Sequence, residues 1–325
     1  MKRFSIIGLC LAVVMVLSLT FGCAPQPAQE PELSGALHIF HAGSLTIPFE
    51  EVTEGFNQLY PDVEVLAEGA GSATTIRKFT ELQRECGVIG SADYTLIPQL
   101  MFPDYADWYI IFATNQMVIA YTEKAKYQDE INADNWHEIL LRGGVEYGHS
   151  DPNADPCGYR TLMVWQLAEI YYGVPGLYQQ LDEACPEKNV RPKEVDLIAL
   201  LEAGALDYAF EYRSVAMQHD LKYLSLPEEL DLSNFELADS YAQAEVEVSG
   251  AEPGTTTTLI GAPIAYGVTI PKDAPHPELA ISFLQFLLSP EGQGIMADCG
   301  QPPIVPAIAS NFDRLPEELK EFVSP

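Results

Sequence analysis

Three short segments combine glycine, alanine and serine in an order suited to binding an oxyanion. They read His-Ala-Gly-Ser at residues 41–44, Gly-Ala-Gly-Ser at residues 69–72 and Ser-Ala-Asp at residues 91–93. Each follows a strand-like run and precedes a predicted helix or turn. Backbone N–H groups at a helix start are unpaired and carry the positive end of the helix dipole, which attracts an oxyanion. Ser44 or Ser72 alone would be an ordinary helix cap, but two such sites on neighbouring strands favour an anion site.

Other chemistries find less support in the residue types and their spacing. His38 and His41 are three residues apart, as zinc ligands on a helix are, but in a strand they point to opposite faces. For the same reason, only one of Glu211 and Tyr212 enters a shared cleft. The sequence contains no Gly-x-Ser-x-Gly elbow, P-loop or dinucleotide fingerprint. We therefore expect no catalytic residues, no enzyme activity and no cofactor.

The first part of the chain body alternates strand and helix patterns. Strands are predicted at residues 36–41, 62–65 and 88–89, and helices at residues 48–60 and 73–86. This order predicts a parallel sheet covered by helices. In open sheets of this kind, ligands bind beyond the carboxyl ends of the strands, which is where the three small-residue segments lie.

Later segments predict a second lobe of the same class. Strand patterns at residues 117–121 and 208–212 accompany helix patterns at residues 161–172 and 192–204. A strand pattern at residues 265–270 and the helix after it are expected to return to the first lobe.

We therefore predict a two-lobed α/β fold in which each lobe is a mainly parallel sheet flanked by helices. Residues 35–115 and 265–325 would form lobe 1, and residues 116–264 would form lobe 2. Two crossing strands, near residues 115–121 and 264–270, would serve as the hinge.

The N-terminus has the pattern of an export signal. A basic start precedes an uncharged apolar run at residues 4–21, and Gly22 and Cys23 are followed by a polar, proline-rich stretch. This order predicts a lipoprotein signal peptide at residues 1–22, lipidation of Cys23, and an anchor and linker at residues 23–34. Plain cleavage or an uncleaved anchor is the alternative. In each case the body lies outside the cytoplasm, and as a lipoprotein it would be anchored to the outer face of the cell membrane.

Composition limits the partners and the cysteine chemistry. Apolar residues are 47% of the chain, and the net charge of −30 disfavours nucleic acid and anionic membrane surfaces. The same charge repels an anion at long range, so capture depends on donors within a Debye length of about 8–10 Å. Four cysteines remain besides Cys10 and Cys23, and without CxxC spacing they favour disulfides or buried thiols over a metal site: Cys86, Cys157, Cys185 and Cys299.

The assembled segments resemble the archaeal-type tungstate/molybdate-binding proteins of ABC importers, in the class of periplasmic-type binding proteins. The resemblance covers about residues 36–306, and its motifs lie at residues 40–45, 91–98, 155–160, 212–216 and 300–306. It implies that the chain captures tungstate or molybdate between two lobes and, as a monomer, delivers it to a permease and ATPase complex. Another oxyanion such as sulfate or phosphate, or ferric ion bound through Tyr212 and carboxylates, is the alternative.

The resemblance also implies a set of ligand-binding residues from both lobes. Glu194 matches the family's second carboxylate ligand, and Glu211 is its rival. The implied set is Gly43, Ser44 and Ser72 from lobe 1, with Asp155, Pro156, Cys157, Glu194 and Tyr212 from lobe 2.

Two carboxylates suit only a particular kind of anion. Sulfate and phosphate have no vacant position for an added ligand, so approaching carboxylates would only repel them. Hexavalent tungsten and molybdenum can expand from four to six oxygen ligands. Asp155 and Glu194 would therefore bind the metal of the oxyanion and exclude the more abundant anions.

Overall fold

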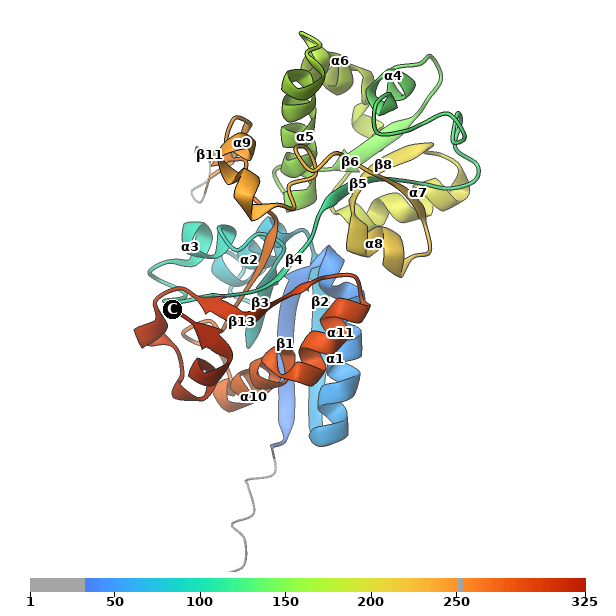
Figure 1. The fold of residues 1–325 in the computed structure, drawn as a ribbon. Coiled ribbons are helices and arrows are strands. Elements are labelled where there is room, and N and C mark those ends of the chain that lie inside the picture. The colour runs from blue at the N-terminus through green and yellow to red at the C-terminus, as the bar shows by residue number, and fades with distance from the viewer. Residues whose placement is uncertain (1–32, 251–253) are drawn as a thin grey trace, which may run out of the picture. The chain divides into compact units, whose positions relative to one another are not determined.

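The computed structural model describes residues 33–250 and 254–325 (Figure 1). The predicted signal peptide, the lipidation site at Cys23 and most of the predicted linker lie outside the described residues. Among the residues described, no helix combines the length and the apolar character needed to cross a membrane.

The larger sheet has seven strands within the described residues, in the order β14-β13-β4-β12-β3-β1-β2. Its strands are β1 (Gly35–Ala42), β2 (Val63–Ala70), β3 (Val88–Ser91), β4 (Ile110–Thr114), β12 (Ala265–Thr269), β13 (Pro303–Ala309) and β14 (Val323–Ser324). Its helices are α1 (Thr46–Leu59), α2 (Ser72–Thr80), α3 (Leu96–Met101), α10 (Pro277–Leu288) and α11 (Pro290–Asp298).

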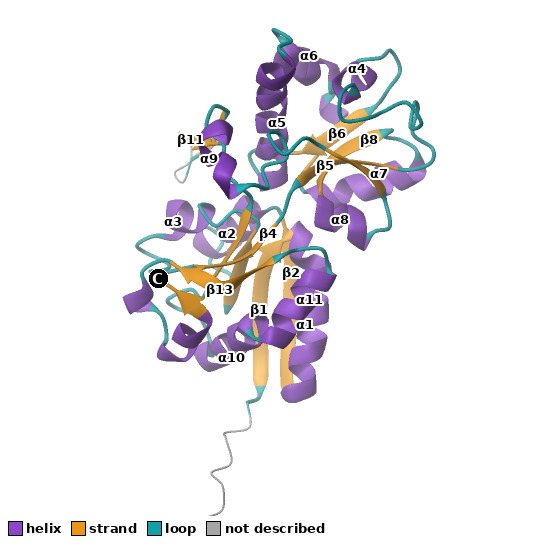
Figure 2. Ribbon diagram, viewed as in Figure 1, coloured by secondary structure: helices purple, strands orange, loops and turns teal. Residues whose placement is uncertain are grey.

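Helices cover both faces of this sheet because successive side chains of β1 point to opposite sides (Figure 2). On one face, Phe49 of α1 packs edge-on against Phe283 of α10 with their ring centroids 5.8 Å apart. On the other face, Phe40 of β1 joins a separate apolar cluster with Ile76 of α2 and Ile97 of α3. The strand ends are thereby held between two packed layers.

The smaller sheet has five strands within the described part of the chain, in the order β7-β6-β8-β5-β9. Its strands are β5 (Met117–Tyr121), β6 (Tyr147–Ser150), β7 (Val190–Arg191), β8 (Tyr208–Tyr212) and β9 (Lys222–Ser225). Its helices are α4 (Trp136–Leu140), α5 (Pro156–Tyr172), α6 (Leu177–Ala184), α7 (Ile198–Ala203) and α8 (Arg213–Gln218). Trp165 of α5 packs against Phe210 of β8 at a centroid distance of 5.5 Å, which fixes α5 on this sheet.

The strand pairing is mixed in both sheets, not mainly parallel. Parallel pairing holds for β2-β1-β3 and for β7-β6-β8, as the strand and helix alternation predicted. In contrast, β12 pairs antiparallel with β3 and β4, and β5 pairs antiparallel with β8 and β9. The reason is connectivity, because β5 and β12 are the strands that follow the two passages between the sheets and enter them in the opposite direction.

The chain passes between the sheets at two places. It leaves the larger sheet after β4 through Asn115 and Gln116, and it returns between β11 and β12. Asn115 Nδ2 donates a 2.8 Å hydrogen bond to Tyr266 Oη, so the two passages are tied together.

A third, two-stranded sheet lies between these elements in sequence. It consists of β10 (Glu245–Ser249) and β11 (Thr256–Ile260), and it follows α9 (Ala238–Tyr241). Gln166 of α5 exchanges two hydrogen bonds with the backbone of Glu245, and Arg77 of α2 donates to the carbonyl of Gly250 at 2.9 Å. The hairpin therefore touches helices of both larger sheets.

Candidate oxyanion site

The ends of three neighbouring strands bring the small-residue segments together. Ala42 is the register partner of Ala70, so β1 and β2 end side by side, and β3 pairs with β1 on its other edge. A 3-10 turn at Gly43–Leu45 follows β1 and leads into α1, whereas α2 begins at Ser72 directly after β2. The sequence periodicity predicted this arrangement, since parallel strands end at the same edge of a sheet.

Two glycines in these segments lie very close to residues of the smaller sheet's lobe. A β-carbon added to Gly43 would lie 2.8 Å from Glu194 Oε2, and one added to Gly71 would lie 2.3 Å from the carbonyl oxygen of Ala154. Real β-carbons do not approach heavy atoms so closely. Glycine is therefore required at residue 71, where the neighbouring atom belongs to the backbone, whereas a methyl group at residue 43 would displace the Glu194 carboxylate.

Each predicted serine accepts a hydrogen bond from another protein group. Tyr266 Oη donates to Ser44 Oγ at 3.0 Å, and the backbone N–H of Ala92 donates to Ser72 Oγ at 3.0 Å. A serine hydroxyl has one proton to donate. Because both oxygens already act as acceptors, both buried hydroxyls are set to donate their proton to a ligand.

Tyr212 is prepared in the same way from the other lobe. Its buried hydroxyl oxygen accepts a 2.6 Å hydrogen bond from Arg160 Nη1. An arginine can only donate, so the phenol proton of Tyr212 is also left to donate. Three hydroxyl groups from two lobes can thus donate hydrogen bonds to a ligand that only accepts them, as an oxyanion does.

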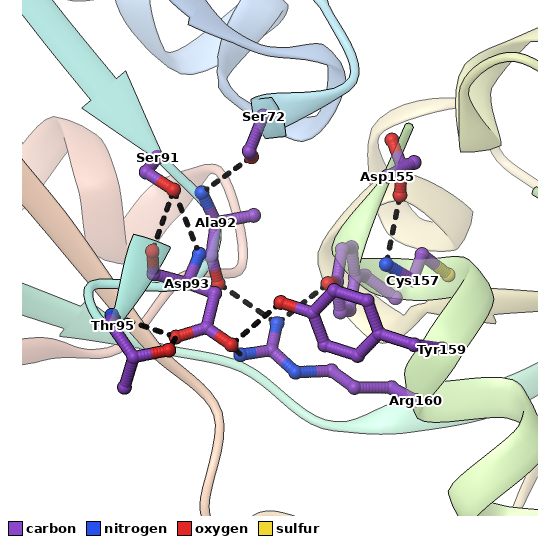
Figure 3. A network of polar contacts seen from close by, with 10 residues as sticks. Ser72, Ser91, Ala92, Asp93, Thr95, Asp155, Cys157, Tyr159 and Arg160 are labelled. Atoms are coloured by element: carbon purple, nitrogen blue, oxygen red, sulfur yellow. Dashed lines mark hydrogen bonds and ion pairs between the residues drawn. The ribbon is translucent and has the colours of Figure 1, made fainter. Parts of the chain in front are cut away.

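Asp155 is held at the start of α5. Its Oδ1 caps the helix by accepting the backbone N–H of Cys157 at 2.8 Å (Figure 3). The same oxygen also accepts the hydroxyl of Ser150 at 3.1 Å. Burial raises the pKa of this carboxyl above its usual range. Pro156 takes the first helical position, where its missing N–H is not needed.

Glu194 reaches the site from a short 3-10 helix at Glu194–Leu197. It is buried, and neither carboxylate oxygen has a hydrogen-bond partner among the described residues. Burial, with the nearby charge of Asp155 as the next cause, raises its pKa well above the usual range. An unpaired buried carboxylate is strongly unfavourable, so these oxygens favour either a proton or a ligand atom that accepts their electron pairs.

Glu211 is a third buried carboxyl group in the same region. Both of its oxygens also lack a hydrogen-bond partner among the residues described. Its pKa is raised well above the usual range by burial and then by the charge of Asp155. Tyr212 is the next residue in β8, and successive side chains of a strand point to opposite faces. The Tyr212 hydroxyl contacts Arg160, whereas Glu211 makes no such contact.

Not every residue implied by the resemblance is equally free to bind. The N–H of Cys157 is already used by Asp155, and its thiol donates to the carbonyl of Phe210 at 3.6 Å. Pro156 offers no N–H. These two residues shape the start of α5, whereas Gly43, Ser44, Ser72, Asp155, Glu194 and Tyr212 present groups that a ligand could use.

Sequence reasoning placed Asp93 and Arg160 inside motifs but gave neither side chain a role of its own. Arg160 is buried, although arginines seldom are, and it lies in an ion pair with Asp93 across the two lobes at 3.4 Å (Figure 3). The spacing does carry a signal, because Arg160 lies one turn after Pro156 and so faces the same side of α5 as the helix start.

The four described cysteines are free thiols: Cys86, Cys157, Cys185 and Cys299. Of the two alternatives left open, disulfides or buried thiols, the second applies to Cys86 and Cys157. Burial raises the pKa of Cys86 to about 12, so this thiol stays protonated and donates to the carbonyl of Val88 at 3.0 Å.

Known structures share this fold. A periplasmic molybdate-binding protein of Azotobacter vinelandii superposes with a TM-score of 0.59 at 16% identity, covering 82% of this chain and 98% of that chain. The sulfate-binding protein SubI of Mycobacterium tuberculosis superposes with a TM-score of 0.59 at 13% identity, covering 83% and 87%. At such identities the likeness concerns the fold alone, and it confirms the predicted two-lobed α/β architecture.

Sequence relatives place the chain more narrowly. A solute-binding protein of Petrotoga mobilis, itself uncharacterized, is 54% identical over 292 residues, which cover 90% of this chain and 91% of that protein. The molybdate/tungstate-binding protein WtpA of Pyrococcus abyssi is 42% identical over 344 residues, which cover 98% of both proteins. Residues 37–300 match the profile of the bacterial extracellular solute-binding proteins. The chain belongs to this family.

Proposed function

We propose that this chain binds tungstate or molybdate in the cleft between its lobes and delivers it to the permease and ATPase of an ABC transporter. One observation carries the proposal: three buried hydroxyl donors, from Ser44, Ser72 and Tyr212, occur together with the buried carboxyl groups of Asp155 and Glu194, and the oxygens of Glu194 have no hydrogen-bond partner among the described residues. The hydroxyls suit the oxygens of an anion. The carboxylates suit its metal.

The two kinds of group make different contributions to binding. The hydroxyls of Ser44, Ser72 and Tyr212, with the backbone around Gly43, would hold the oxygen atoms. Asp155 and Glu194 would add two oxygens to tungsten or molybdenum, raising the coordination number from four to six, while Pro156 and Cys157 form the wall at the start of α5. The relation to WtpA, which is named for molybdate and tungstate, supports this assignment.

The alternatives fit the site less well. Sulfate and phosphate cannot accept a carboxylate as a fifth ligand, so Asp155 and Glu194 would repel them. Ferric ion would lie near the guanidinium of Arg160, which donates to the Tyr212 hydroxyl that iron would need. A positive charge in that position disfavours a trivalent cation.

We also propose that the protein works outside the cytoplasm. The predicted signal peptide at residues 1–22 and lipidation of Cys23 would tether it to the outer face of the membrane, with residues 23–34 as anchor and linker. Binding proteins of this family work with ABC transporters, and a tether keeps the loaded protein near the permease.

A thermal-shift panel of oxyanions and metal ions tests the function directly. A ligand that binds only the folded state raises stability by RT ln(1 + [L]/Kd), about 4 kcal/mol at a thousandfold excess over Kd. We expect tungstate and molybdate to raise the melting temperature by several degrees, and sulfate, phosphate and ferric ion to leave it unchanged. A larger shift with sulfate or ferric ion than with tungstate would contradict the proposal.

A further inference from the structure

We propose that Asp93 is a positioning residue that makes the Tyr212 donor dependent on closure of the two lobes. This inference rests on the proposed function, because Tyr212 is assigned there as a ligand-binding residue. Asp93 follows β3 in lobe 1, whereas Tyr212 ends β8 in lobe 2. Arg160 of α5 is the group that connects them.

The two oxygens of Asp93 have separate tasks. Oδ1 accepts the backbone N–H of Thr95 at 2.9 Å and its hydroxyl at 2.7 Å, so it is fixed within its own loop. Oδ2 faces α5, where it accepts the hydroxyl of Tyr159 at 2.6 Å and pairs with Arg160 Nη2 at 3.4 Å (Figure 3). The contacts of Oδ1 therefore lie within lobe 1, and those of Oδ2 lie with the other lobe.

Arg160 binds acceptors from both lobes at once. Its Nη2 pairs with Asp93, while its Nη1 donates to the carbonyl of Ala92 at 2.8 Å and to Tyr212 Oη at 2.6 Å. Two of these three acceptors belong to lobe 1 and are present only when the lobes meet. Asp93 and Ala92 therefore fix the orientation of the guanidinium group. That orientation lets Arg160 donate to the Tyr212 hydroxyl oxygen, which leaves the phenol proton of Tyr212 available for the ligand.

Ala92 extends the connection to a ligand-binding residue of lobe 1. Its carbonyl accepts Arg160, and its N–H donates to Ser72 Oγ at 3.0 Å. A continuous path of hydrogen bonds thus runs from Ser72 through Ala92 and Arg160 to Tyr212. Closure of the lobes completes this path, so the donors of lobe 1 and lobe 2 become oriented together.

The experiment compares Asp93→Asn with a matched control in the wild-type background. Asn keeps the size and one acceptor oxygen but removes the charge that holds Arg160. Asp207 is the control, because it is also buried and pairs with Lys126 at 3.0 Å, but both partners lie in lobe 2. Calorimetry with tungstate gives Kd, and stopped-flow chase gives the dissociation rate.

We expect Asp93→Asn to weaken tungstate binding by about 10- to 100-fold, mainly through faster dissociation. Asp207→Asn should lower the melting temperature but leave Kd within about twofold of the wild type. Because Asp93 acts through Arg160 on Tyr212, its substitution in a Tyr212→Phe background should add much less than it does alone. A general loss of structure would instead weaken both backgrounds alike.

Tyr159→Phe provides a second variant in case Asp93→Asn does not fold, since it deletes only the hydroxyl that donates to Asp93. A several-fold rise in Kd is expected. An unchanged Kd for Asp93→Asn or Tyr159→Phe, equal losses with Asp207→Asn, or full additivity with Tyr212→Phe would each overturn the inference. A wild-type protein that gives no heat with tungstate would overturn the proposed function, and this inference with it, so the two failures are distinguishable.

Discussion

Glu194 brings a carboxyl group into the protein interior with no hydrogen bond to any described residue. Asp155 is different, because one of its oxygens caps α5 and accepts Ser150. The structural need for a carboxylate therefore applies to Asp155 only. No donor among the described residues requires Glu194 to be a carboxylate, which makes it the residue with which to test selectivity.

We predict that Glu194→Gln weakens tungstate and strengthens sulfate. Glutamine keeps the size and one acceptor oxygen but removes the charge, so the repulsion of sulfate falls while the bond to the metal weakens. Each shift should be on the order of 1–3 kcal/mol in binding free energy. Calorimetric titration of both anions into both proteins measures them. Parallel weakening of the two anions, or no change in either, would show that Glu194 is not the filter, and unchanged tungstate affinity would direct attention to Glu211.

How much of the site is predictable from sequence depends on the distance between partners along the chain. Gly43, Ser44 and Ser72 follow from local pattern, because a strand end and a helix start are read from neighbouring residues. The donor to Ser44 is Tyr266, which is 222 residues away. The contact of Asp93 with Arg160 likewise joins two lobes, and no local periodicity encodes it.

At the scale of elements, the start of α2 sets how closely the lobes can approach. Gly71 has a φ of −56°, an ordinary value for any residue, so its backbone conformation does not require glycine. The requirement comes from the carbonyl oxygen of Ala154, 2.3 Å from where a β-carbon would be. Ala154 immediately precedes Asp155, the cap of α5. Two helix starts from different lobes therefore meet at this contact.

We predict that Gly71→Ala binds tungstate more weakly by about 1–3 kcal/mol, the usual effect of overpacking, because the added methyl group holds the lobes apart. The empty protein should melt near the wild-type temperature, because the lower entropy of the unfolded chain with alanine at a compatible φ offsets the loss of a better N-cap residue. Gly143→Ala is the matched control, because nothing lies within 4 Å of its added β-carbon. Equal tungstate affinity in all three proteins would refute the role of this contact.

Asp231 lies beside the first passage between the sheets, where its backbone oxygen accepts the N–H of Met117 and its side chain accepts Gln116 at 3.3 Å. Burial raises its pKa from the ordinary 3.8 to about 6. A carboxyl whose pKa is raised by folding favours the folded state fully below pH 3.8. That contribution is lost as the pH rises through 6.

Asp231→Asn should therefore raise the stability of the empty protein at pH 8 and have little effect near pH 4. The difference should be on the order of 1–2 kcal/mol, less than the full shift of pKa would give because solvent screens part of the charge. Urea unfolding of both proteins between pH 4 and pH 8 measures it. A difference that is constant over this range would show that the carboxyl does not titrate there.

The sequence periodicity predicted which elements form, but it did not predict where each one ends. The helix predicted at residues 73–86 ends earlier, at Thr80, and Gln83 takes a positive φ of 51°. The chain turns there so that Cys86 can enter the buried edge beside β1 and β3, where its thiol reaches the carbonyls of His38 and Val88. The sequence pattern does not predict this turn, because the hydrogen-bond acceptors of the Cys86 thiol are backbone carbonyls of β1 and β3.

For the whole molecule, the two passages between the sheets decide what motion the fold allows. Residues 115 and 116 form the first, and the residues between Ile260 and Ala265 form the second. We propose that lobes of residues 35–115 with 265–325 and of residues 116–264 rotate about the strands near residues 115–121 and 264–270. The contacts of Gly43 with Glu194 and of Asp93 with Arg160 describe a closed arrangement of these lobes.

Closure on binding is the expected consequence, since donors of Ser44 and Ser72 and the carboxylates of Asp155 and Glu194 come from opposite lobes and can hold one ligand only in a shut cleft. Small-angle scattering should show a smaller radius of gyration with saturating tungstate than without it, and the loaded value should match the closed arrangement. Gly71→Ala at the same ligand saturation should stay larger than the wild type, and sulfate should leave the wild type unchanged. If the radius of gyration does not change at saturation, and the free protein is larger than the closed arrangement, then tungstate binds without closing the lobes. The assignment of ligand-binding residues to both lobes would then be wrong.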